Sequence, residues 1–341
     1  MRSRPKVLLV AYDRQSSGIG SYTLEVANLM KDVADISLLS YDKLDRKTEG
    51  IKTIEVALRM KSRAFPILSF ILNMNFLCGI FNMFDIIHET LPPWGSCVKD
   101  RLVITTKWGY VSHFKLALIR TKGLSFPENV GAIPVTAQHS LMDAISRRKA
   151  RFIVSVNEEG QDFVPPPIEQ RTIKKYECKD ELNLLFVSRD LNIKRKNLEA
   201  VISALKFVRK RKIKLHLVGK GHVDVDAIKY GYLSREDVIK LMYKMDALIL
   251  PSTYEELGYI GLESYSVGLP ALVSDIPSFR TIFKLSPRFN PYDSREIAKL
   301  IEDLSCYDLE EIGRREWEYI KISNKVSKER FIKLYQMFYN E

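Results

Sequence analysis

Short apolar runs alternate with helix-like segments along most of this chain, and that alternation is the feature that most constrains its fold. The first run, residues 6–11, is apolar at every position after Lys6, as expected for a strand buried on both faces of a parallel sheet. Further short runs, each mostly apolar, lie at residues 34–39, 84–88, 102–105, 152–156, 182–188, 214–218, 247–250 and 271–274. The pattern predicts an α/β protein built on doubly wound parallel sheets.

Helical periodicity fills several intervals between these runs. It begins after Ser21, covers residues 198–208, and returns at residues 325–339 near the end of the sequence. Ser234 stands where a helix N-cap is expected, with Asp237 three residues later, so a helix is predicted from there to residue 245. Another short helix is expected over residues 259–267, where Gly268 and Pro270 stop it.

The length of 341 residues exceeds the usual size of one hydrophobic core, so two domains are expected. The segment Phe163-Val-Pro-Pro-Pro-Ile168 marks the boundary, because its three prolines remove three backbone donors and stiffen the chain. We therefore expect one Rossmann-like domain over residues 1–168, a second over residues 169–320, and a C-terminal helical segment over residues 321–341.

Charge and cysteine content narrow the classes of partner and compartment. Lys and Arg outnumber Asp and Glu by 53 to 42, and the net charge of +11 favours an anionic partner such as a phosphorylated ligand or an anionic lipid. No recognisable nucleic-acid module surrounds the basic clusters, including residues 194–196, which are typical of solvated faces. The four cysteines are far apart and lack metal-ligand spacing, which predicts reduced thiols in a cytosolic protein. The apolar run at residues 6–11 is too short for the apolar core and cleavage site of a signal peptide, so secretion is not expected.

Residues 64–84 hold no charged side chain and are about long enough to cross a bilayer. Pro66, Gly79 and three asparagines interrupt the stretch, and large apolar residues fall on several faces of the helix it would form. Three interpretations stay open: a helix of the core, a helix that meets a membrane surface or a lipid acceptor, and a membrane span.

Two acidic and two basic residues of the second half are candidates for a binding site. Glu255 is expected in the loop after the strand at residues 247–250, and Glu263 in the helix behind that loop. Arg189 follows the end of one strand, and Lys196 precedes a helix. All four would lie at the carboxyl edge of one sheet, where doubly wound sheets hold ligands. Carboxylates can accept hydrogen bonds from sugar or ribose hydroxyls, while Arg and Lys can hold phosphate oxygens.

The same region resembles the family 4 retaining glycosyltransferases of the GT-B fold. The segment Pro251-Ser-Thr-Tyr-Glu-Glu-Leu-Gly-Tyr-Ile-Gly-Leu-Glu-Ser-Tyr-Ser-Val-Gly-Leu-Pro-Ala271 is similar to the family pattern P-S-x-x-E-G-F-G-L-x-x-x-E-A-x-A-x-G-x-P-V. Glu256 replaces the usual Gly, and Leu257 replaces the usual Phe. The resemblance implies that Glu255 contacts the donor sugar or phosphate and that Glu263 contacts the ribose.

Weaker parts of the resemblance lie elsewhere. Phe186-Val-Ser-Arg189 and Lys196-Asn197 are similar to the family's V-G-R and K-G segments, with Asn in place of Gly. Ser17-Gly-Ile-Gly20 resembles the glycine loop that approaches the donor phosphates. The catalytic candidates are therefore Arg189, Lys196 and Glu255, and the donor-binding candidates are Gly18, Gly20, Gly258, Tyr259, Ile260 and Glu263.

The first half departs from the family near the transferred sugar. Many members place a His in a T-x-H context after the strand that corresponds to residues 102–105, whereas this chain has Lys107 there. His113 lies one to two helical turns further on and is the other acceptor-side candidate, although a lone His near aromatic residues is also common in a core.

The resemblance implies a GT-B enzyme with an acceptor-side first domain, a donor-binding second domain, a central cleft, and a C-terminal helix that crosses back to the first domain. It implies retaining, metal-independent transfer of a hexose-type sugar from a UDP- or GDP-linked donor to a glycan or lipid-linked hydroxyl, without a cofactor. A sugar-nucleotide epimerase on the same fold and a catalytically silent donor-binding module are the alternatives. The expected location is cytoplasmic, with peripheral contact to the cytosolic membrane face left open.

Overall fold

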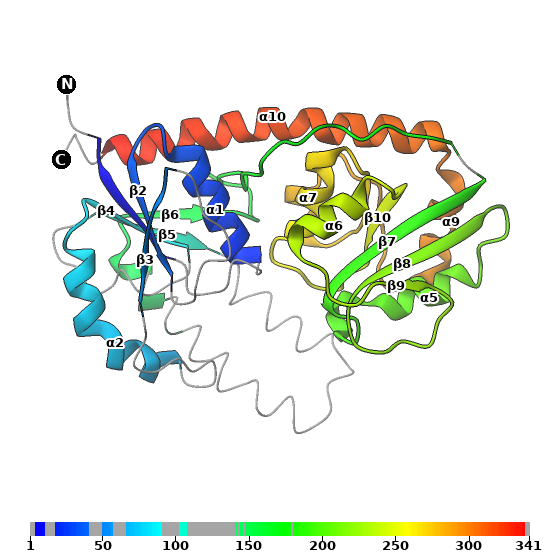
Figure 1. The fold of residues 1–341 in the computed structure, drawn as a ribbon, viewed down its shortest axis with the longest axis horizontal. Coiled ribbons are helices and arrows are strands. Elements are labelled where there is room, and N and C mark those ends of the chain that lie inside the picture. Colours follow the sequence, from blue (N-terminus) through cyan, green and yellow to red (C-terminus); the bar gives the residue numbers. More distant parts are fainter. Residues whose placement is uncertain are drawn as a thin grey trace. The chain divides into compact units, whose positions relative to one another are not determined.

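The computed structural model describes residues 4–10, 18–40, 50–56, 66–90, 102–107, 141, 144–145, 147–178 and 180–337. Contacts between residues divide the chain into two compact units (Figure 1). The first unit comprises Met1–Pro167 together with Asn324–Glu341, and the second unit comprises Ile168–Ser323.

The first unit is built on a six-stranded parallel sheet in the order β3-β2-β1-β4-β5-β6. Apolar side chains of its strands and of one helix form a core cluster that includes Leu8, Leu39, Leu77, Phe81 and Ile87. The elements are β1 (Lys6–Val10), α1 (Gly18–Met30), β2 (Asp35–Ser40), β3 (Lys52–Glu55), α2 (Pro66–Phe81), β4 (Ile86–Glu89), β5 (Leu102–Lys107) and β6 (Phe152–Ser155).

The second unit holds another six-stranded parallel sheet, in the order β12-β11-β10-β7-β8-β9. Its elements are β7 (Glu181–Asp190), the 3-10 helix η2 (Lys194–Lys196), α5 (Leu198–Leu205), β8 (Lys212–Lys220), β9 (Ile228–Lys229), α6 (Arg235–Met242), β10 (Ala247–Leu250), α7 (Tyr259–Val267), β11 (Ala271–Ser274), α8 (Pro277–Ile282), β12 (Arg288–Phe289) and α9 (Ser294–Asp303).

The two sheets share one topology. Counted along the chain within each unit, the spatial order of the strands is third, second, first, fourth, fifth and sixth. This is the order of a dinucleotide-binding doubly wound sheet, in which the direction of winding reverses between the first and fourth strands. The predicted fold class is therefore confirmed.

Helix and strand ends in the second unit follow identifiable residues. Strand β10 ends before Pro251, and α7 begins after Gly258 and ends before Gly268, both of which adopt positive φ. The side chain of Ser234 accepts a hydrogen bond from the backbone N–H of Asp237, as predicted for the start of α6.

Helix α10 (Cys306–Gln336) starts nearly twenty residues before the predicted helix at residues 325–339. Ser305 and Asp308 form its capping box, in which the Ser305 backbone N–H donates to Asp308 at 2.9 Å and the Asp308 N–H donates to the Ser305 hydroxyl at 3.1 Å. From Asn324 onward the helix belongs to the first unit, where Ser327 donates to the Pro165 carbonyl at 2.6 Å. The chain thus returns to the first unit, as the fold resemblance implied.

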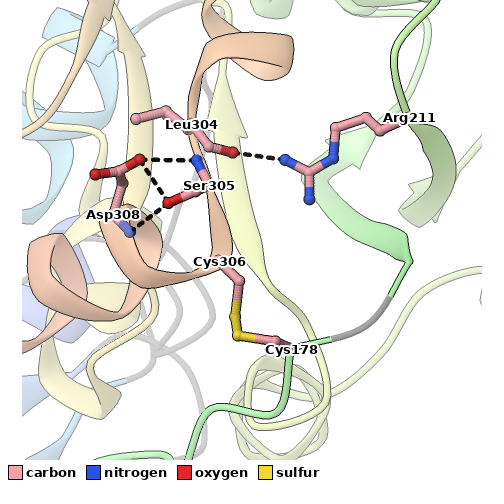
Figure 2. Close-up of a disulfide and its surroundings, with 6 residues drawn as sticks. All are labelled: Cys178, Arg211, Leu304, Ser305, Cys306 and Asp308. Atoms are coloured by element: carbon pink, nitrogen blue, oxygen red, sulfur yellow. Dashed lines mark hydrogen bonds between the residues drawn. A yellow bond between two sulfur atoms is a disulfide. The ribbon is translucent and has the colours of Figure 1, made fainter.

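A disulfide joins Cys178 to Cys306, with 5.5 Å between the Cα atoms (Figure 2). It ties the segment before β7 to the first residue of α10, beside the capping box of that helix. Cys78 is also disulfide-bonded. The expectation of reduced thiols is therefore wrong, because cysteines 128 positions apart in sequence give no sign of their closeness in space.

Within the part of the chain that the structure describes, no helix combines the length and apolar character needed to cross a membrane.

Candidate functional site

The candidate site lies at the carboxyl ends of β7 and β10, the first and fourth strands of the second sheet. These strands are neighbours in the parallel sheet, with Ala247 opposite Leu184. The loops that follow them, residues 191–197 and 251–258, therefore start side by side at the point where the winding of the sheet reverses. Open parallel sheets characteristically bind ligands at this point.

Hydrogen bonds hold the two loops together and tie them to the segment after β12. The Thr253 backbone N–H donates to the Arg195 carbonyl at 2.9 Å, and the Asn197 side-chain amide donates to the carbonyls of Pro251 and Pro291 at 3.0 and 2.8 Å. Asn197 adopts the left-handed conformation, with φ 58°. That conformation favours Gly and tolerates Asn, which explains how Asn can stand where the resembling family has Gly.

Glu255 is the centre of the ion-pair network between these loops. Its Oε2 lies 2.5 Å from Lys196 Nζ and 2.8 Å from Arg195 Nη1. Burial alone would raise the pKa of Glu255, but the charges and hydrogen bonds of Lys196 and Arg195 outweigh it and hold that pKa below its ordinary value. Glu255 is therefore ionised at neutral pH, and the two loops meet in a charge-assisted network.

Glu256 behaves differently from its neighbour. Burial, reinforced by the negative charge of Glu255, raises the pKa of the Glu256 carboxyl to about 8, although Arg195 opposes the shift. Glu256 is thus mostly protonated at pH 7. With one ionised carboxylate facing two cations, the cluster of Arg195, Lys196, Glu255 and Glu256 carries an excess of about one positive charge, which suits an anionic ligand.

Gly258 sets the start of α7 beside this cluster. Its φ of 64° is left-handed, and a Cβ at this position would lie 2.6 Å from the Phe279 ring. Only Gly fits both constraints. Tyr259 and Ile260 form the first turn of α7, with Tyr259 buried and Ile260 half-buried. The backbone N–H groups of this first turn point out of the helix, which is favourable for a phosphate.

Glu263 is buried one turn further along α7, where it forms a short ion pair with Arg235. Arg235 is the first residue of α6, and its guanidinium lies 5.9 Å from the centre of the Tyr259 ring. The sequence did not indicate Arg235 as a site residue, because it precedes two acidic residues at a helix start and looks like a surface charge.

Of the two predicted basic residues, Arg189 and Lys196, the structure brings only Lys196 into an ion pair with a predicted acid. Lys196 reaches Glu255, whereas Arg189 occupies an exposed position one residue before the end of β7. Among the described residues, the second cation on Glu255 is Arg195. Sequence reasoning missed Arg195 because residues 194–196 form a basic triplet of the kind usually found on solvated faces. The resemblance of the adjacent Lys196-Asn197 to a family segment was the signal that could have directed attention to it.

Among the described residues, the predicted site residues of the first unit are not part of the ion-pair network around Glu255. Gly18 and Gly20 lie in the first turn of α1, so the helix begins earlier than predicted, and Gly20 is buried. Lys107, the last residue of β5, is ion-paired with Glu158 at 2.5 Å. His113 lies outside the described residues.

At the equivalent edge of the first sheet, several of the described side chains are hydroxyl groups that bond to one another or to the backbone. Thr90, after β4, donates to the Val10 carbonyl at 3.0 Å and lies 2.6 Å from the hydroxyl of Thr23 on α1. Thr105 donates to the fully buried carboxylate of Glu89 in a short hydrogen bond. His88 is buried between the Tyr335 and Thr106 hydroxyls, and burial lowers its pKa to about 3, so the ring is neutral.

Among the residues whose placement the structure gives, no group of three or more His, Cys, Asp or Glu side chains is arranged to hold a metal ion.

A family model matches the part of the chain that contains this site. Residues 181–305, which run from the start of β7 to just before α10, match the family model described as Glycosyl transferases group 1. The matched segment contains both acids of the site and their cations. It covers the sheet of the second unit and none of the first.

Curated relatives match a similar length of chain. An uncharacterised glycosyltransferase of Methanocaldococcus jannaschii, MJ1607, is 28% identical over 119 residues, which are 31% of this chain and 30% of the relative. A 41.2 kDa protein of the cps region of Klebsiella pneumoniae is 23% identical over 107 residues, which are 29% of each chain. The chain thus matches less than a third of the length of these relatives.

Solved structures match over nearly the whole chain at low identity. HepE of Anabaena, determined with UDP and glucose, has a TM-score of 0.70 at 13% identity and covers 96% of this chain and 99% of its own. Sucrose-phosphate synthase of Thermosynechococcus elongatus has a TM-score of 0.73 at 12% identity, with 99% and 100% covered. WaaG, a glycosyltransferase involved in lipopolysaccharide biosynthesis, has a TM-score of 0.57 at 15% identity, with 98% of each chain covered. This likeness establishes the GT-B fold.

Proposed function

We propose that this protein is a retaining glycosyltransferase that moves a hexose-type sugar from a UDP- or GDP-linked donor to a hydroxyl of a glycan or lipid-linked acceptor. The observation that carries the proposal is the network of Lys196, Arg195 and Glu255 at the reversal point of the second sheet, inside the segment that matches the glycosyltransferase family model. HepE, which shares the fold, was determined with UDP-glucose, and this is consistent with a nucleotide-sugar donor.

The proposed roles follow from the charges. Lys196, with Arg195 and the exposed Arg189, neutralises the diphosphate that departs as the acceptor hydroxyl attacks the anomeric carbon. Glu255 contacts the donor sugar or phosphate, and Glu263 accepts hydrogen bonds from the ribose. The start of α7, formed by Gly258, Tyr259 and Ile260, contributes backbone donors to the phosphates. The proposed reaction needs neither metal nor cofactor.

The first unit supplies the acceptor side in this proposal. Gly18 and Gly20, at the start of α1, are the residues of this unit assigned to the donor phosphates, and Lys107 or His113 is the residue assigned to the acceptor hydroxyl. Lys107 has Glu158 as its partner, so a carboxylate is available beside it for a proton or a hydrogen bond.

A donor screen tests the proposal directly. UDP-, GDP- and ADP-sugars are added to the full chain and its melting temperature is measured, because a ligand that binds the folded state raises that temperature. We expect a UDP- or GDP-sugar to raise it in the natural protein and much less in Lys196→Ala. No shift with any donor contradicts the proposal.

Product analysis then separates transfer from the two alternatives. Release of UDP or GDP with a glycosylated acceptor supports transfer. An altered sugar that stays linked to the nucleotide indicates an epimerase, and binding without turnover across an acceptor panel indicates a donor-binding module.

We further propose that the protein works as a peripheral protein at the cytosolic membrane face. The net charge of +11 supports contact with an anionic surface. The Cys178–Cys306 bond does not by itself favour a reducing compartment, so the location is measured directly. Protease protection on intact membrane fractions should find the protein accessible from the cytosolic side, and protection from that side contradicts the proposed location.

A further inference from the structure

Helix α2 has apolar side chains on its exposed side as well as on its buried side. Leu77 and Phe81 are fully buried in the core of the first unit. On the opposite side, Leu68, Ile71, Leu72 and Phe76 are between 46% and 57% exposed. Their spacing of three and four residues aligns them along one side of the helix. We refer to these four residues as the α2 apolar face.

Helix α9 shows what an ordinary surface helix of this chain looks like. Its buried side carries Ile297 and Ile301, and its exposed positions are Arg295, Glu296, Lys299 and Asp303. Such a division between apolar and charged sides is usual for helices at a protein surface. The α2 apolar face departs from it, because α2 contains no charged residue at all. An exposed apolar patch of this size is commonly an interaction surface.

A second exposed group is anchored to the same core. Leu141 and Ile145 are 53% and 39% exposed, and Arg148 and Lys149 follow them on the surface. The helical spacing of Leu141, Ile145 and Arg148 aligns them on one side. Ala150, directly after this group, packs against the cluster that contains Leu77 and Phe81 of α2.

Basic residues outnumber acidic ones in the sequence on either side of these positions. Residues 56–85 contain Arg59, Lys61 and Arg63 and one acid, Asp85, and residues 141–151 contain four Lys or Arg and one acid, Asp143. The first unit holds 26 Lys and Arg and 18 Asp and Glu, which makes +8 of the chain's +11. The unit that carries the exposed apolar residues is thus also the more basic one.

We propose that the α2 apolar face, together with Leu141, Ile145, Arg148 and Lys149, is the surface through which this protein docks on an anionic lipid bilayer. The α2 helix, about 24 Å long from its sixteen residues, lies along the surface with its four apolar side chains at the boundary between headgroups and acyl chains. The basic side chains pair with anionic headgroups. This assignment does not depend on sugar transfer, since a donor-binding module could dock in the same way.

A bilayer fits these observations better than a second copy of the chain does. Two copies that met through this surface around a twofold axis would bring identical basic residues toward one another, and like charges repel. An anionic bilayer instead attracts every one of those charges and accepts the apolar side chains without demanding a complementary shape. The sign of the charge therefore decides between the two occupants.

Co-sedimentation of the full chain with vesicles tests the proposal. We expect binding to vesicles of phosphatidylcholine mixed with phosphatidylglycerol, and weak binding to phosphatidylcholine alone. The double variant Ile71→Ser/Phe76→Ser should bind the mixed vesicles at least about tenfold more weakly, because two large apolar side chains leave the acyl boundary. Arg148→Gln should weaken binding about fivefold, and added salt should reduce that difference.

A matched control distinguishes this surface from general stickiness. Tyr307 and Ile322 of α10 are 77% and 61% exposed, and the double variant Tyr307→Ser/Ile322→Ser removes as many exposed apolar side chains from another part of the chain. It should bind vesicles like the natural protein. All four positions are exposed, so melting temperatures should change little and report whether each variant folds.

Two results would overturn the proposal. One is equal vesicle binding by the natural protein and Ile71→Ser/Phe76→Ser, including the case in which neither binds. The other is a concentration-dependent dimer in vesicle-free sedimentation that the same double variant abolishes, since the face would then be occupied by a second copy.

Discussion

The two sheets share a strand order, but the described side chains at their carboxyl edges differ. At the reversal point of the second sheet, Lys196 and Arg195 surround the ionised Glu255. At the equivalent point of the first sheet, hydroxyl groups such as Thr90 bond to one another and to the backbone, and the neighbouring Glu89 is buried against a threonine. Among the described residues, one topology thus carries an ion-pair network at the reversal point of one sheet and hydroxyl hydrogen bonds at that of the other.

Lys196 and Lys107 give the sharpest test of that difference, because each lies 2.5 Å from a Glu at the edge of its own sheet. Lys196→Ala should weaken donor binding about a hundredfold. It removes a charge-assisted contact to the diphosphate, and it leaves the negative charge of Glu255 less neutralised beside that diphosphate. Lys107→Ala should leave donor affinity unchanged. Isothermal titration with the donor found in the screen measures both. Equal losses in the two variants would erase the distinction between the edges.

Asn197 and Thr90 test how the loops are held at the two edges. Asn197→Ala should lower the free energy of unfolding by about 2 to 3 kcal/mol, since it removes two hydrogen bonds and puts Ala in the left-handed region. Asn197→Gly should cost about 1 kcal/mol less, because Gly adopts that conformation freely. Thr90→Val should cost about 1 kcal/mol and spare donor binding. Denaturant unfolding supplies these values; indistinguishable Ala and Gly variants would rule out the role of backbone conformation.

Replacing His88 in the first unit and His216 in the second tests how a buried histidine makes the free energy of unfolding depend on pH. Burial lowers the pKa of His88 to about 3, so the unfolded chain binds a proton that the folded chain does not between about pH 6.5 and 3. Stability therefore falls as the pH falls through that window, and His88 should contribute a loss of about 2 kcal/mol between pH 7 and pH 5. His88→Gln should remove this part of the pH dependence.

His216 is the internal control for that measurement. It bonds to the Tyr230 hydroxyl and to Asn183, and its pKa is also lowered, mainly by burial, but the negative charges of Asp246 and Glu181 oppose that shift. His216→Gln should change the slope of stability against pH less than His88→Gln does. The reverse ranking would contradict burial as the cause of the lowered pKa of His88.

The smallest expected effect is the pH dependence of donor affinity, which compares Glu256 with Glu89. The pKa of Glu256 is about 8, so ionisation above that pH cancels the excess positive charge beside the proposed phosphate site. Donor affinity should fall about fivefold between pH 7 and pH 9, and Glu256→Gln should flatten the profile. Glu89→Gln should leave it unchanged. A profile that keeps its slope in Glu256→Gln would assign the effect to another group.

How much the sequence predicts differs between the two units for physical reasons. Strands β10 and β11 have the predicted bounds, because every position except Ser274 is apolar and Pro or Gly stands beside them. Strand β3 was not predicted, since it lies at the sheet edge with three exposed polar residues and a single half-buried apolar one, and so has no apolar run. Periodicity detects burial, and it fails where a strand is barely buried.

The sequence predicted the acidic residues of the candidate site better than the basic ones. Glu255 and Glu263 stand in a motif with fixed neighbours, whereas a basic side chain looks alike in sequence whether it is solvated or paired. Arg195 and Arg235 reach their partners through an Asn197 turn and a helix start that only the folded chain reveals. Whether Arg189 takes part stays a prediction.

The bond between Cys178 and Cys306 turns the sheet-bearing part of the second unit into a covalent ring. A single cut in any surface loop between them opens this ring without releasing a fragment, so a nicked protein would migrate as one species until it is reduced. Because the two ends of that segment already meet, its starting point is arbitrary. A circularly permuted version that opens in the loop at residues 221–227 and joins the old ends by a short linker should fold to the same sheet.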